Sequence, residues 1–405
     1  MAEAGAPETG HGTQEHVVHD AVGPAFTPVE AGAAIAIGVV SLLIAGELSV
    51  LLGGLADEHR LSASGIGLSA TFEALTMGIV AGLVGVFLKP KRLRLLGVAA
   101  TLALALADLA TTRVSGNGVL TVRAFCGIPE GLLLWLTIGM IARTETPERW
   151  AAVLFTALTS AQLAVATTFA AVILPRFGAN GGFVFLAVVS LIGLVIVIFV
   201  PDRYAPLPHE GQAGGGSPPL RGWIALAATL IFVSAAGAVG IYLVPLAHQA
   251  GLTAGVAQTA LSTSLAAQIL GGVLATVVAG RVNYFAVFVG STLASLAAWA
   301  VYGFAAPAWL FIASTTLLGF ISIFMTPFLL PMTIEADPSR RAAVQSGAAQ
   351  LLGGALGPFL ASMVVDEHHS RGALYLGVGL MLAGMAIIAW LHFTARAAEA
   401  AEAVV

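Results

Sequence analysis

The chain is a succession of apolar segments, each close to the ~20 residues that an α-helix needs to cross the hydrocarbon core of a bilayer. Short polar stretches with Gly, Pro, Asn or Asp separate them, such as Ser115–Gly118 and Ala336–Pro338. Segments of this length in lipid must satisfy their own backbone hydrogen bonds and are therefore helices. The sequence predicts an all-α membrane protein with twelve transmembrane helices, at 32–54, 64–88, 95–112, 119–142, 150–174, 181–200, 223–246, 254–280, 284–303, 308–332, 342–365 and 372–394.

The composition excludes most soluble classes of protein. The chain is 58% hydrophobic and only 9% charged, whereas a soluble domain has about 25% charged residues. The net charge of −4 is small and indicates no nucleic-acid partner. The single cysteine, Cys126, lies inside a predicted helix, so neither disulfides nor a thiolate metal site is expected. No phosphate-binding Gly-Lys-Ser/Thr motif occurs, so we expect no ATP-driven transport. We also expect no cofactor and no metal, and we expect that the chain is not an enzyme.

The distribution of Lys and Arg predicts the orientation of the chain in the membrane. Most of the 17 Lys and Arg residues fall in loops on the same side of the membrane as the N-terminus. The opposite loops carry only Arg60, Arg113, Arg176 and Arg371. By the positive-inside rule, both termini are cytoplasmic and the chain resides in the plasma (inner) membrane. Residues 1–28 and 395–405 are then cytoplasmic tails, the first of them disordered by its composition.

The two halves of the chain repeat each other at a gapless offset of 191 residues. The clearest match places PERWAAV at 147–153 on PSRRAAV at 338–344. Residues 201–222, rich in Pro, Gly and Ser, form a predicted flexible cytoplasmic linker between the copies. Two pseudo-symmetric six-helix bundles, 29–200 and 223–394, are therefore expected, and such a parallel duplication is a transporter architecture.

Two motifs support a family resemblance. VRAFCGIPEG at 122–131 resembles the fourth-helix Arg-x-x-x-Gly motif of the major facilitator superfamily, carried here by Arg123 and Gly127. The stretch 85–94 is similar to that family's Gly-x-x-x-Asp-Arg turn, with Lys89 at the aspartate position. The resemblance implies that helices 1, 4, 7 and 10 line a central cavity and that helix 3 is peripheral. We expect a monomer in the lipid bilayer that takes a small-molecule substrate.

Charged residues at membrane depth are the candidate site, because such charges are costly and normally face a bundle interior or a polar path. They are Glu47, Glu73, Asp108, Arg123 and Glu130, all in the first half. Depth along the helices favours a Glu47–Arg123 ion pair, with Asp108 as the alternative partner of Arg123. Glu130 is the expected proton carrier and Glu73 its reserve, although an interhelical hydrogen bond is an equal alternative for Glu73.

The substrate cavity is expected to include Tyr242, Gln268 and Trp135. Because the chain lacks a nucleotide site, transport must draw on a gradient. The leading hypothesis is a secondary active transporter that moves a small organic solute by alternating access with proton coupling. The alternatives are a facilitated uniporter and a non-transporting relative that assembles or delivers partners.

Overall fold

The computed structural model describes residues 26–205, 207, 217–304, 306–365 and 371–402. The first half contains α1 (Pro28–Asp57), α2 (Ala63–Phe87), α3 (Leu93–Thr111), α4 (Asn117–Ile141), α5 (Pro147–Thr168) and α6 (Leu174–Ile196). The second contains α7 (Leu220–Gly240), α8 (Leu243–Gln249), α9 (Ala254–Val278), α10 (Tyr284–Gly303), α11 (Ala308–Met325), α12 (Leu329–Ala336), α13 (Arg341–Ser362) and α14 (Arg371–Glu402). Short π or 3₁₀ turns lie at Phe169–Ile173, Val197–Phe199 and Thr326–Phe328.

The expected all-helical membrane fold is confirmed. Among the described residues, nine helical stretches are long and apolar enough to cross a membrane, judged by length and composition. One of them, Pro147–Phe199, is broken at Gly178, where φ is 62° and ψ is −166°, a conformation open to glycine because it lacks a Cβ. With this break, each of the twelve predicted segments coincides with one helix or one interrupted helix.

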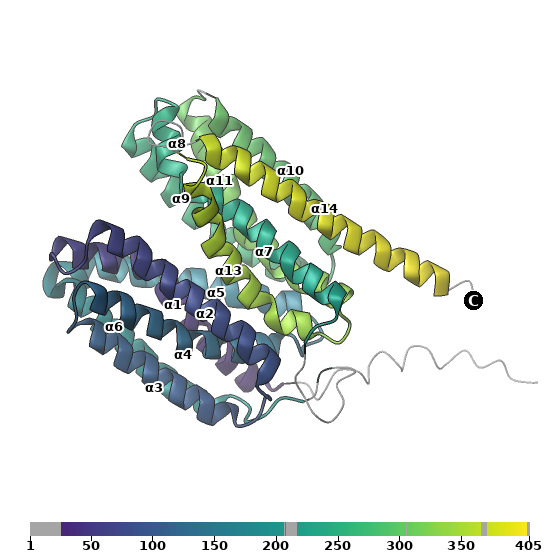
Figure 1. Cartoon of the computed structure of the whole chain (residues 1–405), viewed down its shortest axis with the longest axis horizontal. Coiled ribbons are helices and arrows are strands. Elements are labelled where there is room, and N and C mark those ends of the chain that lie inside the picture. Colours follow the sequence, from purple (N-terminus) through teal and green to yellow (C-terminus); the bar gives the residue numbers. More distant parts are fainter. Residues whose placement is uncertain (1–25, 206, 208–216, 305, 366–370, 403–405) are drawn as a thin grey trace, which may run out of the picture.

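The helix boundaries reproduce the offset of the sequence repeat. Helices α2, α3 and α4 begin at Ala63, Leu93 and Asn117, whereas α9, α10 and α11 begin 191 residues later, at Ala254, Tyr284 and Ala308. Figure 1 shows the two copies as separate bundles, the first in purple and blue and the second in green and yellow. In these three pairs of helices, positions 191 residues apart therefore lie equally far from the starts of their helices.

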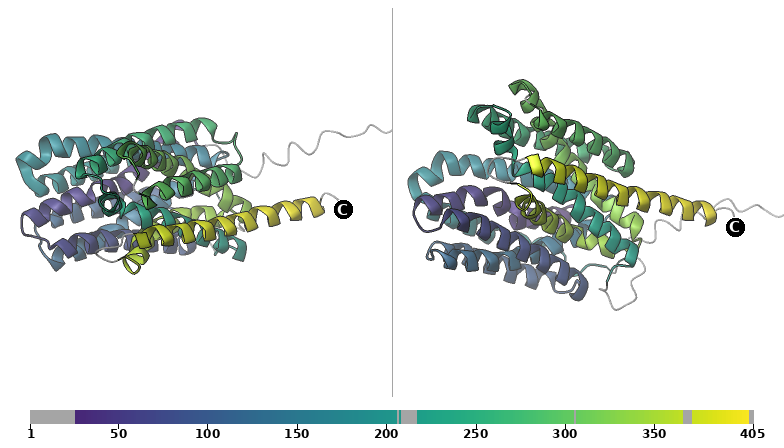
Figure 2. Two further views of the ribbon diagram at one scale, coloured as in Figure 1. Left: turned by 90° about the horizontal axis from the view of Figure 1, so that it is seen from above. Right: turned by 45° about the horizontal axis from the view of Figure 1, so that its top comes forward.

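The two bundles pack against each other near the end that carries the linker. Helix α2 meets α13, where Gly82 faces Ala348, and α5 meets α9, where a Cβ on Gly272 would collide with Thr156. Arg340, in the turn before α13, donates hydrogen bonds across the interface to the carbonyl oxygens of Ala142 and Thr144, at 2.9 and 2.8 Å. Toward the opposite end the ribbons of the two bundles diverge (Figures 1 and 2).

The start of the predicted linker is fixed to the first bundle. The Tyr204 hydroxyl donates to the carbonyl of Leu136 at 2.9 Å, and Arg143 Nε donates to the carbonyl of Ala205 at 2.8 Å. The Arg143 guanidinium also lies over the Tyr204 ring, 5.4 Å from its centroid. Residues 206 and 208–216 and the tail 1–25 lie outside the described residues. At the other end of the chain, residues 395–402, expected as a tail, continue α14 (Figure 1).

Candidate functional site

Arg123 is the centre of a charged cluster inside the first bundle. It lies on α4, six residues after the helix begins, and its side chain is completely buried. Its guanidinium donates two hydrogen bonds to the carboxylate of Glu73 on α2. Arg123 Nε donates to Glu73 Oε2 at 2.9 Å, and Arg123 Nη2 donates to Glu73 Oε1. The remaining nitrogen, Nη1, donates to Asp108 of α3 at 2.8 Å. The ring of Phe183 on α6 lies 5.7 Å from the guanidinium carbon, close enough for a cation–π contact.

Two glycines of α4 bring α2 close enough to form this cluster. Gly127 and Gly131 follow Arg123 by about one and two helical turns, so they lie on the same side of α4. A Cβ at Gly127 would collide with the backbone of Glu73, and one at Gly131 with the backbone of Met77. The Arg-x-x-x-Gly motif therefore sets the approach of α2 that allows Glu73 to reach the guanidinium.

Glu130 completes the cluster from α4 itself. Its Oε1 lies 3.9 Å from Arg123 Nη2, and this oxygen has no hydrogen-bond partner among the described residues. Ser41 of α1 donates to the Glu130 backbone carbonyl at 2.8 Å. The three carboxyl groups face one guanidinium, and all four side chains are at least 96% buried. Full ionisation would leave two uncompensated negative charges in the bundle interior, which favours binding of protons there.

The expected Glu47–Arg123 pair is not formed in this structure. The Ser41–Glu130 contact places Glu47 and Arg123 at similar depth. Glu47 lies about 9 Å from this contact along α1, and Arg123 lies about 10.5 Å from it along α4. The guanidinium donors are nevertheless used by Glu73 and Asp108. The expectation failed because it assigned α3 to the periphery, whereas Asp108 of α3 points into the bundle. Glu47 is buried, and neither of its carboxyl oxygens has a hydrogen-bond partner among the described residues.

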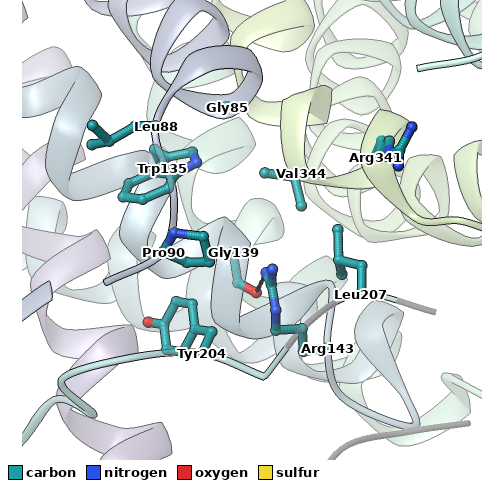
Figure 3. Close-up of a pocket in the computed structure, with 10 residues that line it drawn as sticks. All are labelled: Gly85, Leu88, Pro90, Trp135, Gly139, Arg143, Tyr204, Leu207, Arg341 and Val344. Atoms are coloured by element: carbon teal, nitrogen blue, oxygen red, sulfur yellow. Dashed lines mark hydrogen bonds between the residues drawn. The ribbon is translucent and has the colours of Figure 1, made fainter. Parts of the chain in front are cut away.

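The three residues expected to line one substrate cavity lie in different places. Trp135 is buried at the linker end of α4, where it lines a small cavity with Arg143, Tyr204 and Val344 (Figure 3). That cavity holds only about 20 Å³, roughly one water molecule. The linker end of the interface is thus too tightly packed at this point to admit a solute.

Gln268 of α9 lines a larger cavity of about 220 Å³ inside the second bundle. Tyr242, at the break between α7 and α8, is half-buried and packs against apolar residues of the second bundle. It does not line the cavity that holds Gln268.

Sequence reasoning placed Gln268 in a cavity but did not place the counterparts of the first-half charges around it. Ser264, Trp299 and Ile321 line its cavity, and they lie 191 residues after Glu73, Asp108 and Glu130. The repeat offset was therefore a usable signal, because it places these residues where the first bundle has its charges. The contacts of Arg340 were also missed, although the shared Pro-x-Arg-x-Ala-Ala-Val motif marks that turn.

Comparison with known proteins decides the family. The sequence profile of the Major Facilitator Superfamily matches residues 31–352, most of the chain. The chain belongs to the Major Facilitator Superfamily. This is a family of membrane transporters, so transport rather than catalysis is its class of function. No curated protein sequence matches the chain significantly.

Solved structures of transporters from this superfamily share the fold. The fucose transporter FucP, described in its outward conformation, has a TM-score of 0.72 and 14% identity, covering 89% of this chain and 98% of its own. The Escherichia coli fucose:proton symporter FucP in a variant form has a TM-score of 0.72 and 13% identity, covering 90% and 99%. The human organic anion transporter MFSD10 (TETRAN) has a TM-score of 0.70 and 15% identity, covering 90% and 100%. The TM-scores show that the two-bundle architecture is shared. Identities of 13–15% carry no argument about the substrate of this chain.

Proposed function

We propose that this transporter is a secondary active transporter that moves a small organic solute by alternating access and couples this movement to protons. The observation that carries the proposal is the buried cluster of three carboxyl groups around Arg123. A buried group of this kind holds protons when dry and releases them when a conformational change lets water in. Coupling then needs no ion site beyond the cluster itself.

Within the cluster, Glu130 is the proposed proton carrier. Its Oε1 has no hydrogen-bond partner in the described part of the chain and is 3.9 Å from the guanidinium, whereas Glu73 and Asp108 each bind the guanidinium within 2.9 Å. The proton is thus assigned to the carboxyl group that Arg123 compensates least. Glu73 is the reserve carrier, because its carboxylate is bound to the same guanidinium and would take up a proton if that ion pair broke.

The distribution of Lys and Arg supports an orientation with both termini and the linker in the cytoplasm. The proposal places the chain in the plasma membrane as a monomer. In that orientation the packed linker end is cytoplasmic, and the diverging ends of the bundles face outward. The structure then corresponds to an outward-facing state. One structural neighbour is named a fucose:proton symporter, so the fold is able to carry proton coupling.

The test uses the purified chain in proteoliposomes that enclose a pH-sensitive dye. Pools of small neutral and charged metabolites are added outside, and solute-induced proton flux is recorded. We expect at least one pool to drive proton movement through the native chain. Glu130→Gln should abolish this flux while sparing exchange of labelled solute, because the amide imitates the protonated carboxyl. Glu145→Gln, at an exposed carboxylate in the loop before α5, is the matched control.

Each outcome separates the candidate functions. Solute exchange without proton flux in the native chain would identify a facilitated uniporter. Full proton-driven accumulation by Glu130→Gln would remove Glu130 from the mechanism. Absence of both exchange and flux with every pool would favour the non-transporting relative.

A further inference from the structure

The second bundle contains a cavity at the place where the first bundle has its charged cluster. The cavity, of about 220 Å³, lies between α7, α9, α10 and α11, with Met381 of α14 at one wall. Its lining includes Ser264, Trp299 and Ile321, the counterparts of Glu73, Asp108 and Glu130. Exposed residues at Ala236 and Leu261 line it as well, so the cavity communicates with the surface of the bundle.

Several polar groups in this lining have no partner in the described part of the chain. Trp299 and Ser295 are 4% and 5% exposed, yet neither the indole N–H nor the serine hydroxyl forms a hydrogen bond there. The Gln268 amide is likewise unpaired. By contrast, Ser322, which also lines the cavity, donates to the backbone carbonyl of Gly319 at 2.7 Å. These polar atoms are not enclosed by protein, so they are accessible from the cavity and available to bind a ligand or water there.

The remaining polar contact offers an acceptor. The Tyr302 hydroxyl lies 2.8 Å from Thr315 Oγ1, and Thr315 itself donates to the Phe311 carbonyl at 2.9 Å. Thr315 has only one hydrogen to donate, so Tyr302 is the donor of the pair. The lone pairs of the Tyr302 oxygen are then free to accept a bond from a molecule in the cavity.

None of the described residues that line the cavity is charged. Helices α9, α10 and α11 contain no Asp, Glu, Lys or Arg. The nearest such residue on α7 is Arg221, eleven residues or about 16 Å from the cavity residue Phe232. A charged ligand would lose its hydration here without a compensating partner, which costs several kcal/mol.

We propose that this cavity binds a small uncharged molecule with a flat or ring-shaped apolar face and at least one hydroxyl or carbonyl group. The Trp299 and Phe232 rings supply the apolar wall. Gln268, Ser295 and the Trp299 N–H supply donors, and Tyr302 supplies an acceptor. An apolar cavity of about 150 Å³ holds benzene, which has six heavy atoms, so this cavity of about 220 Å³ admits a molecule of about nine heavy atoms. Resting on the transport function proposed above, this molecule represents the cargo class.

The first bundle suggests how to fill the cavity with residues that this fold already tolerates. Ser295 and Gln268 correspond at the 191-residue offset to Leu104 and Met77, which are both buried in the first bundle. Ser295→Leu and Gln268→Met therefore reduce the cavity and remove its unpaired groups. Thr276→Ala is the matched control, because the Thr276 hydroxyl bonds to its own helix, α9, and does not line the cavity.

The test measures binding to the full chain in lipid nanodiscs by ligand-observed NMR. The probes are benzyl alcohol, benzoate and benzylammonium, which share a ring and differ in charge. Benzyl alcohol is expected to bind saturably and at least tenfold more tightly than either ion. Ser295→Leu and Gln268→Met should each weaken its binding at least tenfold, whereas Thr276→Ala should leave it unchanged. Empty nanodiscs of the same lipid give the background from partition into the bilayer.

The thermal unfolding midpoint shows whether each variant is folded. Equal binding of the three probes, or native binding by folded Ser295→Leu and Gln268→Met, would overturn the inference. If benzyl alcohol binds selectively, these variants weaken its binding and no solute drives proton flux, the proposed binding site is supported. That result overturns only the proposed proton coupling. If Ser295→Leu and Gln268→Met carried out proton-coupled transport at the native rate, the cavity would not be the cargo site. The proposed proton coupling would still stand.

Discussion

The two bundles share helix boundaries but differ in what fills their interiors. In the first, α2, α3 and α4 contribute Glu73, Asp108, Arg123 and Glu130 to one buried ionic cluster. At the equivalent places, the second bundle has Ser264, Trp299, Ser314 and Ile321 and leaves a cavity of about 220 Å³. A duplicated backbone therefore supports two interiors, one suited to charge and one suited to a neutral molecule. The two proposals above assign energy coupling to the first bundle and solute recognition to the second.

The largest expected effect comes from removing the centre of the ionic cluster. Arg123→Ala leaves Glu73, Asp108 and Glu130 buried without a cation, and breaking a buried ion pair in this way costs about 3–5 kcal/mol. We expect a large drop in the thermal unfolding midpoint and no transport. Ser314→Ala, at the equivalent position of the second bundle, is the control and should change stability little. Comparable losses in both variants would contradict the contrast between the bundles.

The double variant Arg123→Gln with Glu73→Gln separates stability from function. It removes the cation together with its bidentate partner, and so it should recover much of the unfolding midpoint while remaining inactive in transport. Normal transport by this double variant would show that the Arg123–Glu73 pair is structural only.

The second prediction introduces a charge into the neutral bundle. Ile321→Glu places a carboxyl group at the counterpart of Glu130, where the described lining offers no cation. Burial of an unpaired polar group of this kind costs about 1–3 kcal/mol, and the unfolding midpoint should fall accordingly. Adding Ser314→Arg recreates the spacing of Arg123 and Glu130 and should recover part of the loss. No recovery in the double variant would show that the two bundles differ in more than these side chains.

The third prediction concerns the interface at the linker end. Arg340→Gln removes two hydrogen bonds from the guanidinium to Ala142 and Thr144, which join the bundles at 2.9 and 2.8 Å. Hydrogen bonds of charged groups contribute about 1.5–3 kcal/mol when buried, and partial exposure reduces this. We expect the equilibrium to shift up to about tenfold toward opening at the linker end.

Opening at the linker end is measured as a longer distance between spin labels on exposed Glu145 and Arg281, one in each bundle, with Cys126 replaced by serine. Arg149→Gln is the control, since Arg149 occupies the equivalent repeat position and is exposed. An unchanged distance distribution in Arg340→Gln would mean that apolar packing alone closes this end.

The helices and the duplication were predictable from sequence because hydropathy and a fixed offset report them directly. Predicted segment 284–303 coincides with α10, and α2 and α9 begin 191 residues apart. The burial of Arg123, Glu73 and Glu130 was predictable from the cost of charge in lipid.

The pairing within the cluster was not predictable in the same way. Depth along a helix placed Glu47 level with Arg123, but the rotation of α3 about its axis, which depends on tertiary packing, decides that Asp108 is the partner. Trp135, Gln268 and Tyr242 do not line one cavity, and the rotation of each helix about its axis again decides this. Hydropathy does not report which face of a helix meets a cavity.

The smallest expected effect concerns Glu47, the charged residue outside the cluster. Both of its carboxyl oxygens are buried without a hydrogen-bond partner among the described residues. An isolated carboxylate is far costlier to bury than a neutral carboxyl, so the protonated form is favoured in this state. Glu47→Gln has nearly the same volume and removes no hydrogen bond, so stability should change by less than about 1 kcal/mol. Transport under a pH gradient should also persist, in contrast to its loss in Glu130→Gln. Glu47→Gln could instead abolish proton-driven transport at native stability. Glu47 would then have to replace Glu73 or Asp108 as a partner of Arg123 in the other conformation. Coupling would in that case involve α1 as well as α4.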